Sequence, residues 1–291
     1  MNFRSVRRAL FTLVVAVAGL GAVRLVTTIP SPIAAFNDPS QAAAAVRIDQ
    51  IKEALIAEYG DRAPQKWGER VPGVITKIDT TEKVVALTLD ACGGGGLSNG
   101  FDKELIDYLI REDIPATLFI NARWIDANHE TFMELARNPL FTIANHGALH
   151  KPLSVTGRSV YGIKGTADVG EVIDEVLLNE RKIESLTGSK PRYFRSGTAY
   201  YDEVAVKIVN DLGEKVIGFD VLGDAGATFN REQVRRAFLS SRPGSIIIAH
   251  MNHPESETAE GIMAAVPELR SKGFRFVKLE EYDDLLLPVQ P

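Results

Sequence analysis

This chain of 291 residues has one cysteine, no large excess of charge and no apolar run as long as a typical membrane span. With Cys92 alone, a disulfide within the chain is excluded. The formal net charge of −5 argues against nucleic acid as a partner, because phosphate binding requires a basic surface. The glycines at 93–96 are not followed by Gly-Lys-Ser or Gly-Lys-Thr, which argues against a nucleotide-binding P-loop.

What the chain does contain is the composition of a globular protein. Hydrophobic residues make up 45% of it and charged residues 24%, and both values are near the average for globular proteins. The length fits one domain of roughly 200–250 residues with extensions, which is enough to bury a sizeable core.

The N-terminus carries a segment typical of export. Arg4, Arg7 and Arg8 precede an apolar or small run over residues 9–23, and Arg24 ends it. A basic start followed by such a run is typical of an export signal, and the run is shorter than the roughly 20 residues of a spanning helix. We expect residues 1–38 to be an export signal or a retained membrane anchor, followed by a linker. The protein would then be periplasmic, secreted or anchored to the outer face of the cytoplasmic membrane. The alternative is a buried first helix of the domain.

Strand-like and helix-like segments alternate over most of the chain. Apolar runs typical of strands cover residues 84–89, 116–120, 141–144, 216–219, 245–249 and 274–277. Helical patterns cover residues 101–111, 130–137, 166–187, 204–212 and 258–272, and Gly188 ends the longest of them. This alternation predicts an α/β domain over residues 82–285 with a mostly parallel sheet, either a barrel or an open sheet. We expect residues 39–81 to form a helical and β extension before it.

Several polar side chains follow these strands directly. His146 and His150 come just after residues 141–144, and Asp90 follows residues 84–89. In parallel α/β folds, the loops at the carboxyl ends of strands carry the chemistry. Two imidazoles spaced i, i+4 lie on the same face of one helical turn, which suits a single divalent cation. For Asp90, the alternative is a flexible turn in which this residue caps the next helix.

Two further strand ends carry candidate catalytic groups. His250 follows a buried strand, and a histidine there suits a general acid because its free pKa lies near neutrality. Asp220 or Asp224 would hold its imidazole and fix its tautomer. Arg195 would orient a neighbouring carboxylate. The competing interpretations are a hydrogen-bonded core histidine and an ordinary surface ion pair.

Taken in order, these segments resemble the polysaccharide deacetylases of carbohydrate esterase family 4, the NodB-homology domain. Thr88-Leu89-Asp90-Ala91 is similar to the first motif, Thr-Phe-Asp-Asp. Residues 146–150 match the second motif, His-x-x-x-His, and residues 246–250 match the fifth. Arg195 and Asp224 match the third and fourth. The resemblance covers about residues 82–282 and implies a distorted (β/α) barrel of about seven parallel strands.

The resemblance also implies an activity and a cofactor. The activity is hydrolysis of an N-acetyl or O-acetyl group on a cell-envelope polysaccharide such as peptidoglycan. The cofactor is a divalent metal, often zinc, which His146, His150 and Asp90 would hold. Asp90, oriented by Arg195, would take a proton from the attacking water. His250, oriented by Asp224, would protonate the leaving nitrogen.

The remaining expected site residues line the substrate groove. They are Gly93, Gly94, Tyr200 and His253.

The sequence departs from the family pattern in its first, third and fourth motifs. Ala91 stands where the family has the aspartate that is the third metal ligand. Asp90 itself, another group such as Cys92, or water would fill that position, or the metal is absent. Pro-Tyr-Gly does not follow Arg195, and the fourth motif lacks its tryptophan. Two other functions therefore stay open: an allantoinase-like amidohydrolase acting on a small cyclic amide, and a non-catalytic glycan-binding protein of the same fold.

Overall fold

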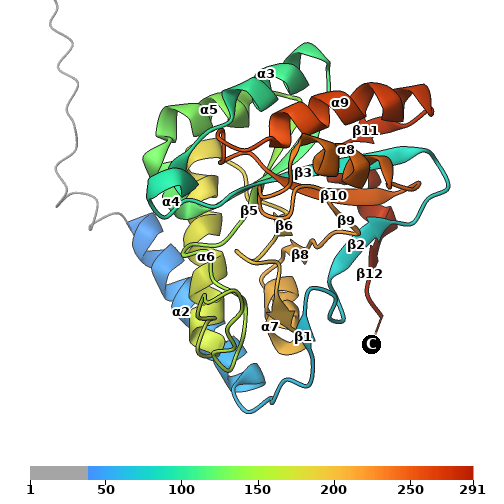
Figure 1. Cartoon of the computed structure of the whole chain (residues 1–291). Coiled ribbons are helices and arrows are strands. Elements are labelled where there is room, and N and C mark those ends of the chain that lie inside the picture. The colour runs from blue at the N-terminus through green and yellow to red at the C-terminus, as the bar shows by residue number, and fades with distance from the viewer. Residues whose placement is uncertain (1–38, 291) are drawn as a thin grey trace, which may run out of the picture. The chain divides into compact units, whose positions relative to one another are not determined.

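Figure 1 shows the computed structural model of the chain, which describes residues 39–290. The expected export signal or anchor lies outside these residues. Within the described part, no helix combines the length and the apolarity that a membrane span requires. Residues 48–291 form one compact unit, and this unit contains every candidate site residue.

The centre of this unit is a curled, mostly parallel sheet. Its strands follow the order β12-β2-β10-β3-β4-β5-β6-β8. The parallel part comprises β3 (Val84–Ala91), β4 (Ala116–Ile120), β5 (Phe141–Asn145), β6 (Tyr193–Phe194), β8 (Lys215–Val216) and β10 (Ser245–His250). β9 (Val221–Leu222) pairs in parallel with β10, and β11 (Arg275–Val277) pairs in parallel with β3. β2 (Ile75–Ile78) and β12 (Leu286–Pro288) are antiparallel.

The two ends of the sheet approach each other. Ile217, just after β8, forms a parallel bridge to Ile75 of β2. The Gly218 N–H donates to the Ile75 carbonyl at 2.7 Å. The prediction of a distorted (β/α) barrel is therefore confirmed, and the open sheet that the pattern left possible is wrong.

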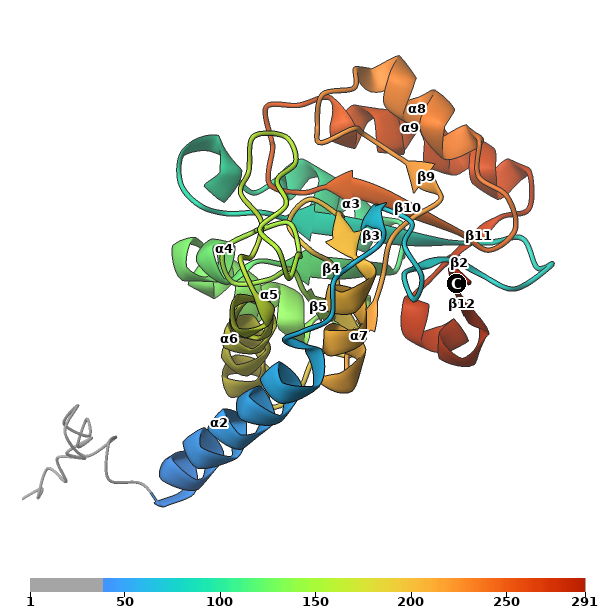
Figure 2. The ribbon, with the colours of Figure 1, turned by 90° about the horizontal axis from the view of Figure 1, so that it is seen from below.

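Helices cover the outside of this barrel. They are α3 (Lys103–Arg111), α4 (Ala122–Ala127), α5 (His129–Arg137), α6 (Val169–Thr187), α7 (Glu203–Asp211), α8 (Arg231–Leu239) and α9 (Thr258–Ser271). Figure 2 shows α8 and α9 side by side over β9 and β10. α4 and α8 were not predicted. Gly188 ends α6 with a left-handed backbone, as the sequence predicts, because glycine carries no side chain to strain there.

Successive residues of β3 alternate between two apolar layers. Leu87, Leu89 and Ala91 belong to the outer cluster that packs against the helices. Ala86 belongs to the cluster inside the curled sheet. Because side chains of a strand alternate, Asp90 points to the inside and Ala91 to the helix layer.

The segment before β3 contributes to the same unit. The Tyr59 hydroxyl at the end of α2 (Pro39–Tyr59) donates to Asp211 Oδ2 of α7 at 2.5 Å. β1 (Trp67–Gly68) pairs with β7 (Tyr201–Asp202), and β2 joins the main sheet. The expected boundary after residue 81 thus falls between two strands of one sheet.

Candidate functional site

The two histidines after β5 lie in a loop rather than on a helical turn. Gly147 has φ +75° and His150 has φ +60°, which no α-helix contains, so the helical part of the prediction is wrong. The Glu175 carboxylate of α6 shapes this loop by accepting the N–H of Leu149 at 3.0 and 2.9 Å and that of Lys151 at 3.1 Å. The two imidazoles still meet, with ring centroids 4.9 Å apart.

Each of these two imidazole rings has one nitrogen that is free to bind a ligand. His146 Nδ1 lies 3.0 Å from the Arg195 carbonyl, so this nitrogen is the donor and Nε2 keeps its lone pair. His150 Nε2 is buried and has no hydrogen-bond partner among the described residues. A buried polar atom without a partner is costly, so this nitrogen is available to bind a ligand.

Cys92 completes the group. It follows Asp90 by two positions, so its side chain returns to the inside of the barrel. Its Sγ and one nitrogen each of His146 and His150 all lie within 4.8 Å of one another. Asp90 is not a member of this group, and Ala91 packs in the outer core. Among the described residues, the Cys92 thiol is therefore the group placed to serve as the third donor that the sequence left open.

This donor set fits a metal such as zinc. Burial alone would raise the pKa of the Cys92 thiol, but the charge of His150 and the neighbouring imidazoles of His146 and His250 hold it well below its usual range. The thiolate is the form of cysteine that binds metals. Cys and His are preferred zinc ligands, and the Arg195 carbonyl orients His146 as an outer-sphere partner does in such sites.

Asp90 and Arg195 form a buried ion pair beside this group. Arg195 Nη1 donates to Asp90 Oδ1 at 2.6 Å, and Nη2 donates to Thr88 Oγ1 at 2.9 Å. Nη2 and Nε also donate to backbone carbonyls of residues 218 and 217 at 3.1 Å each. All three nitrogens of the guanidinium are thus hydrogen-bonded, and the bond from Nη1 holds the Asp90 carboxylate in place. The second oxygen, Asp90 Oδ2, lies 3.6 Å from His146 Nε2.

His250 and Asp224 form a second pair across from Asp90. His250 lies in register with Asp90 on the adjacent strand. Its Nδ1 is 2.9 Å from Asp224 Oδ1, and its backbone N–H donates to Asp224 Oδ2 at 2.7 Å. Burial alone would lower the pKa of His250, but the Asp224 carboxylate raises it well above the ordinary value. Asp220 instead bonds Ser245 and the N–H of Ile246, so it does not hold His250.

The four residues expected to line the substrate groove differ in what surrounds them: two glycines are closely packed, His253 is ion-paired and Tyr200 contacts aromatic rings. A Cβ on Gly93 would lie 2.4 Å from the Trp124 backbone nitrogen, so this glycine is required for packing against α4. A Cβ on Gly94 would lie 2.7 Å from Arg123 Nη1. His253 Nδ1 pairs with Glu255 at 2.8 Å. Tyr200 packs against other aromatic rings, which are described below.

Asp102, not Asp90, caps α3. Its side chain accepts the Leu105 N–H at 2.9 Å. The interpretation of Asp90 as a helix cap is therefore wrong.

One motif in this region has the form of a nucleophile elbow. Residues 96–100 read Gly-Leu-Ser-Asn-Gly, the Gly-x-Ser-x-Gly of serine hydrolases. In the structure Ser98 lies on the short 3₁₀ helix η1 (Gly96–Asn99), not on a strand-to-helix turn. Within the described residues its hydroxyl has no hydrogen bond to a histidine, so Ser98 lacks the base that a nucleophile requires.

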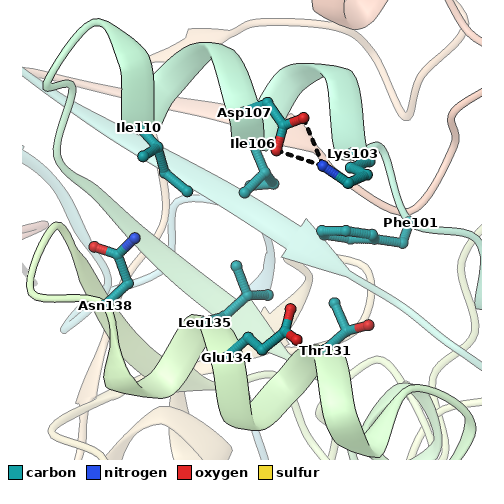
Figure 3. A pocket seen from close by; sticks show the side chains of 9 residues that line it. All are labelled: Phe101, Lys103, Ile106, Asp107, Ile110, Thr131, Glu134, Leu135 and Asn138. Carbon is teal, nitrogen blue, oxygen red and sulfur yellow. Dashed lines mark hydrogen bonds and ion pairs between the residues drawn. The ribbon is translucent and has the colours of Figure 1, made fainter.

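A separate hollow lies on the outer face of the barrel. Figure 3 shows this cavity of about 160 Å³ between α3 and α5, with Phe101, Ile106 and Leu135 among its walls and the Lys103–Asp107 ion pair at its edge. Its lining contains no histidine or cysteine. This cavity is therefore not part of the site formed by Asp90, Cys92 and the histidines.

The chain is similar to known proteins in sequence and in fold. It is 20% identical over 214 residues to the peptidoglycan-N-acetylglucosamine deacetylase of Bacillus cereus, covering 72% of this chain and 92% of that protein. A CE4 family pseudoenzyme from Bacillus anthracis has 22% identity and a TM-score of 0.60, covering 73% of this chain and 69% of that one. A mutant of that pseudoenzyme with restored activity has 23% identity, covers 73% of this chain and 71% of its own, and has a TM-score of 0.61. A family 4 acetyl xylan esterase from Clostridium thermocellum, solved with a cobalt ion, has 22% identity and a TM-score of 0.57 over 72% of this chain and 95% of its own.

The sequence model of the polysaccharide deacetylase family matches residues 77–217, which contain the first three motifs and the whole proposed metal-binding group. The curled parallel sheet agrees with the fold of the similar structures. Residues 77–217 therefore carry the sequence pattern of the polysaccharide deacetylase family, on a fold like that of the similar structures.

Proposed function

We propose that this chain is an exported, metal-dependent hydrolase that removes acetyl groups from an N-acetylated cell-envelope polysaccharide such as peptidoglycan. The observation that carries the proposal is the convergence of three groups of side chains. A Cys92, His146 and His150 donor set lies beside a fixed carboxylate, Asp90, and the ring of His250 lies near the same thiol. The proposal of export rests on the basic and apolar pattern of residues 1–38.

Cys92, His146 and His150 would hold the metal. When bound, a divalent cation lowers the pKa of water and polarises a carbonyl, which are the two requirements of amide hydrolysis at neutral pH. Asp90 Oδ2 is free of Arg195 and accepts the proton of the attacking water, while Arg195 keeps the carboxylate in place through Oδ1.

His250 supplies the proton that the leaving group requires. As the water oxygen bonds to the acetyl carbon, the carbon–nitrogen bond breaks, and the leaving nitrogen takes a proton from the imidazolium. The products are acetate and a free amine on the sugar. Asp224 keeps His250 protonated and oriented, because its carboxylate accepts from Nδ1 and stabilises the positive ring.

One observation favours a second candidate, a glycan-binding protein without turnover. The solved pseudoenzyme from Bacillus anthracis shares the fold, and in this chain Ala91 replaces the aspartate of the first motif. This candidate predicts binding of N-acetylated oligosaccharides with no release of acetate.

The test is acetate release by the purified full-length chain loaded with zinc or cobalt. N-acetylglucosamine oligomers and peptidoglycan are the substrates. We expect release by the wild type and its loss, together with metal binding, in His146→Ala. The control is His129→Ala, because His129 is exposed on α5 and its ring lies beside Glu130, its neighbour in sequence. Binding of the oligomers by folded, metal-loaded protein without any acetate would instead support the second candidate.

A further inference from the structure

Three aromatic side chains and two charged ones gather beside this site. The rings of Trp67 and Tyr200 lie 5.8 Å apart, and those of Tyr161 and Tyr200 lie 5.5 Å apart, edge to face. The Arg158 guanidinium lies 5.2 Å from the Trp67 ring. The charge of Glu69 acts on the Tyr161 hydroxyl. We call these five residues the aromatic platform.

Backbone contacts connect the platform to the proposed metal-binding loop. The Tyr200 carbonyl accepts the Leu153 N–H at 3.0 Å, so the segment after Arg195 runs alongside the segment after His150. A Cβ on Gly197 would lie 2.3 Å from the His150 carbonyl carbon. The platform therefore flanks the site at the rim where His150 emerges.

Tyr161 occupies an unfavourable position for an aromatic residue. It has φ +53° and is followed by Gly162 at φ +75°, in a tight turn between Val160 and Ile163, which bridge each other. A bulky residue at positive φ is strained, and Tyr161 is also 71% exposed. The turn thus presents a large ring to solvent at a conformational cost, an arrangement typical of a ligand-binding position.

The charges of the platform indicate a neutral ligand. Arg158 and Glu69 have opposite charges, so together they select neither an anion nor a cation. A hydrogen bond with Tyr200 and the charge of Glu69 raise the pKa of Tyr161 to about 12, so its hydroxyl stays a neutral donor. Aromatic faces flanked by such groups match a pyranose ring, which has apolar C–H faces and a rim of hydroxyls.

We infer that the aromatic platform is a subsite for a sugar unit of the polysaccharide chain, next to the unit whose acetyl group enters the site. This inference rests on the proposed function for the identity of the sugar. Trp67 lies before the residues that match the family model, and Tyr161 lies on a turn that carries none of the motifs. Because the platform would bind an additional sugar unit, this chain should prefer long oligomers over short ones.

The test compares binding of a hexamer and a dimer of N-acetylglucosamine to the full-length protein by calorimetry. We expect Tyr161→Ala and Trp67→Ala to weaken hexamer binding by roughly tenfold and to leave dimer binding unchanged. Tyr161→Phe keeps the ring and should bind the hexamer nearly as the wild type does. Tyr282→Ala is the matched control, because Tyr282 also carries an arginine over its ring, at 5.7 Å, but belongs to the C-terminal 3₁₀ segment η2 (Leu279–Leu285).

The outcomes separate this inference from the proposed function. Hexamer binding that depends on Tyr161 and Trp67, in a protein that releases no acetate, would support the platform and reject deacetylation. Acetate release with unchanged hexamer affinity and unchanged kcat/KM in Tyr161→Ala would overturn the platform and keep deacetylation. Because Tyr161 is exposed on a turn, its substitution by alanine tests the inference even where Trp67→Ala unfolds.

Discussion

Asp90, Ala91 and Cys92 divide between the two faces of β3, and this division decides which side chains reach the site. Asp90 and Cys92 point into the barrel, where they meet His146. Ala91 points away and is fully buried in the cluster that packs against the helices. At the residue scale, the position that differs from the family motif is therefore a core position in this chain.

Ala91→Asp should destabilise the protein without providing a metal ligand. The new carboxylate would be buried in the apolar layer with no partner, so we expect the free energy of unfolding to fall by about 2 kcal/mol or more. Chemical denaturation measures this loss, and zinc titration of the remaining folded protein should show no gain in affinity. Tighter zinc binding with unchanged stability would mean that residue 91 faces the site.

Asp224→Asn should shift the pH dependence of turnover. In the proposed mechanism His250 acts in its protonated form, so activity should be lost as pH rises through the pKa of His250, which Asp224 raises. Without the carboxylate this pKa falls, and the alkaline limb of kcat/KM should move to lower pH. Asp220→Asn is the control, since Asp220 bonds Ser245 instead. An alkaline limb at the same pH in Asp224→Asn would remove His250 from the role of general acid.

At the scale of elements, α6 supports the loop that contains His146 and His150, the proposed metal-binding loop. Its Glu175 carboxylate is buried, accepts backbone N–H groups on both sides of His150 and lies where a side chain on Gly147 would collide. Burial raises the pKa of Glu175 even though these donors oppose the shift. The helix thus holds His150 in a backbone conformation that the loop would rarely adopt alone.

Glu175→Gln should weaken metal binding while the protein stays folded. The amide NH₂ would face backbone donors in place of a carboxylate oxygen, so the loop loses part of its support. We expect zinc affinity to fall roughly 10–100-fold, as is typical for residues that orient metal ligands. Glu171→Gln is the control on the same helix, because Glu171 is only partly buried and pairs with the Lys151 side chain at 2.8 Å. Equal zinc affinity in both variants would show that Glu175 has no part in the site.

The elements that could be predicted are those with long apolar or amphipathic patterns. β3, β4, β10 and α6 lie where the sequence predicts them, with Gly188 at the end of α6. Residues 216–219 were expected as a strand, but β8 covers only Lys215–Val216 because the chain leaves the sheet to close the barrel at Ile217. α8 was missed although Asn230 and Gln233 form a capping box, a signal that the sequence does contain.

At the scale of the whole molecule, the site depends on strands that are distant in sequence. Asp90, His146 and His250 follow β3, β5 and β10, and the pairing of these strands brings their carboxyl ends together. The sequence predicted these residues, since each follows an apolar run. It did not select Cys92 as the third donor, because only the alternation of β3 shows which of residues 90–92 face the barrel.

Zinc K-edge absorption of the zinc-loaded, full-length protein tests this account most directly. The account predicts one zinc per chain with a single sulfur neighbour at about 2.3 Å and nitrogen or oxygen in the remaining positions. In Cys92→Ser the sulfur neighbour should disappear. Zinc surrounded only by nitrogen and oxygen in the wild type, or no zinc retained by the folded chain, would contradict the claim that Cys92 binds the metal together with His146 and His150.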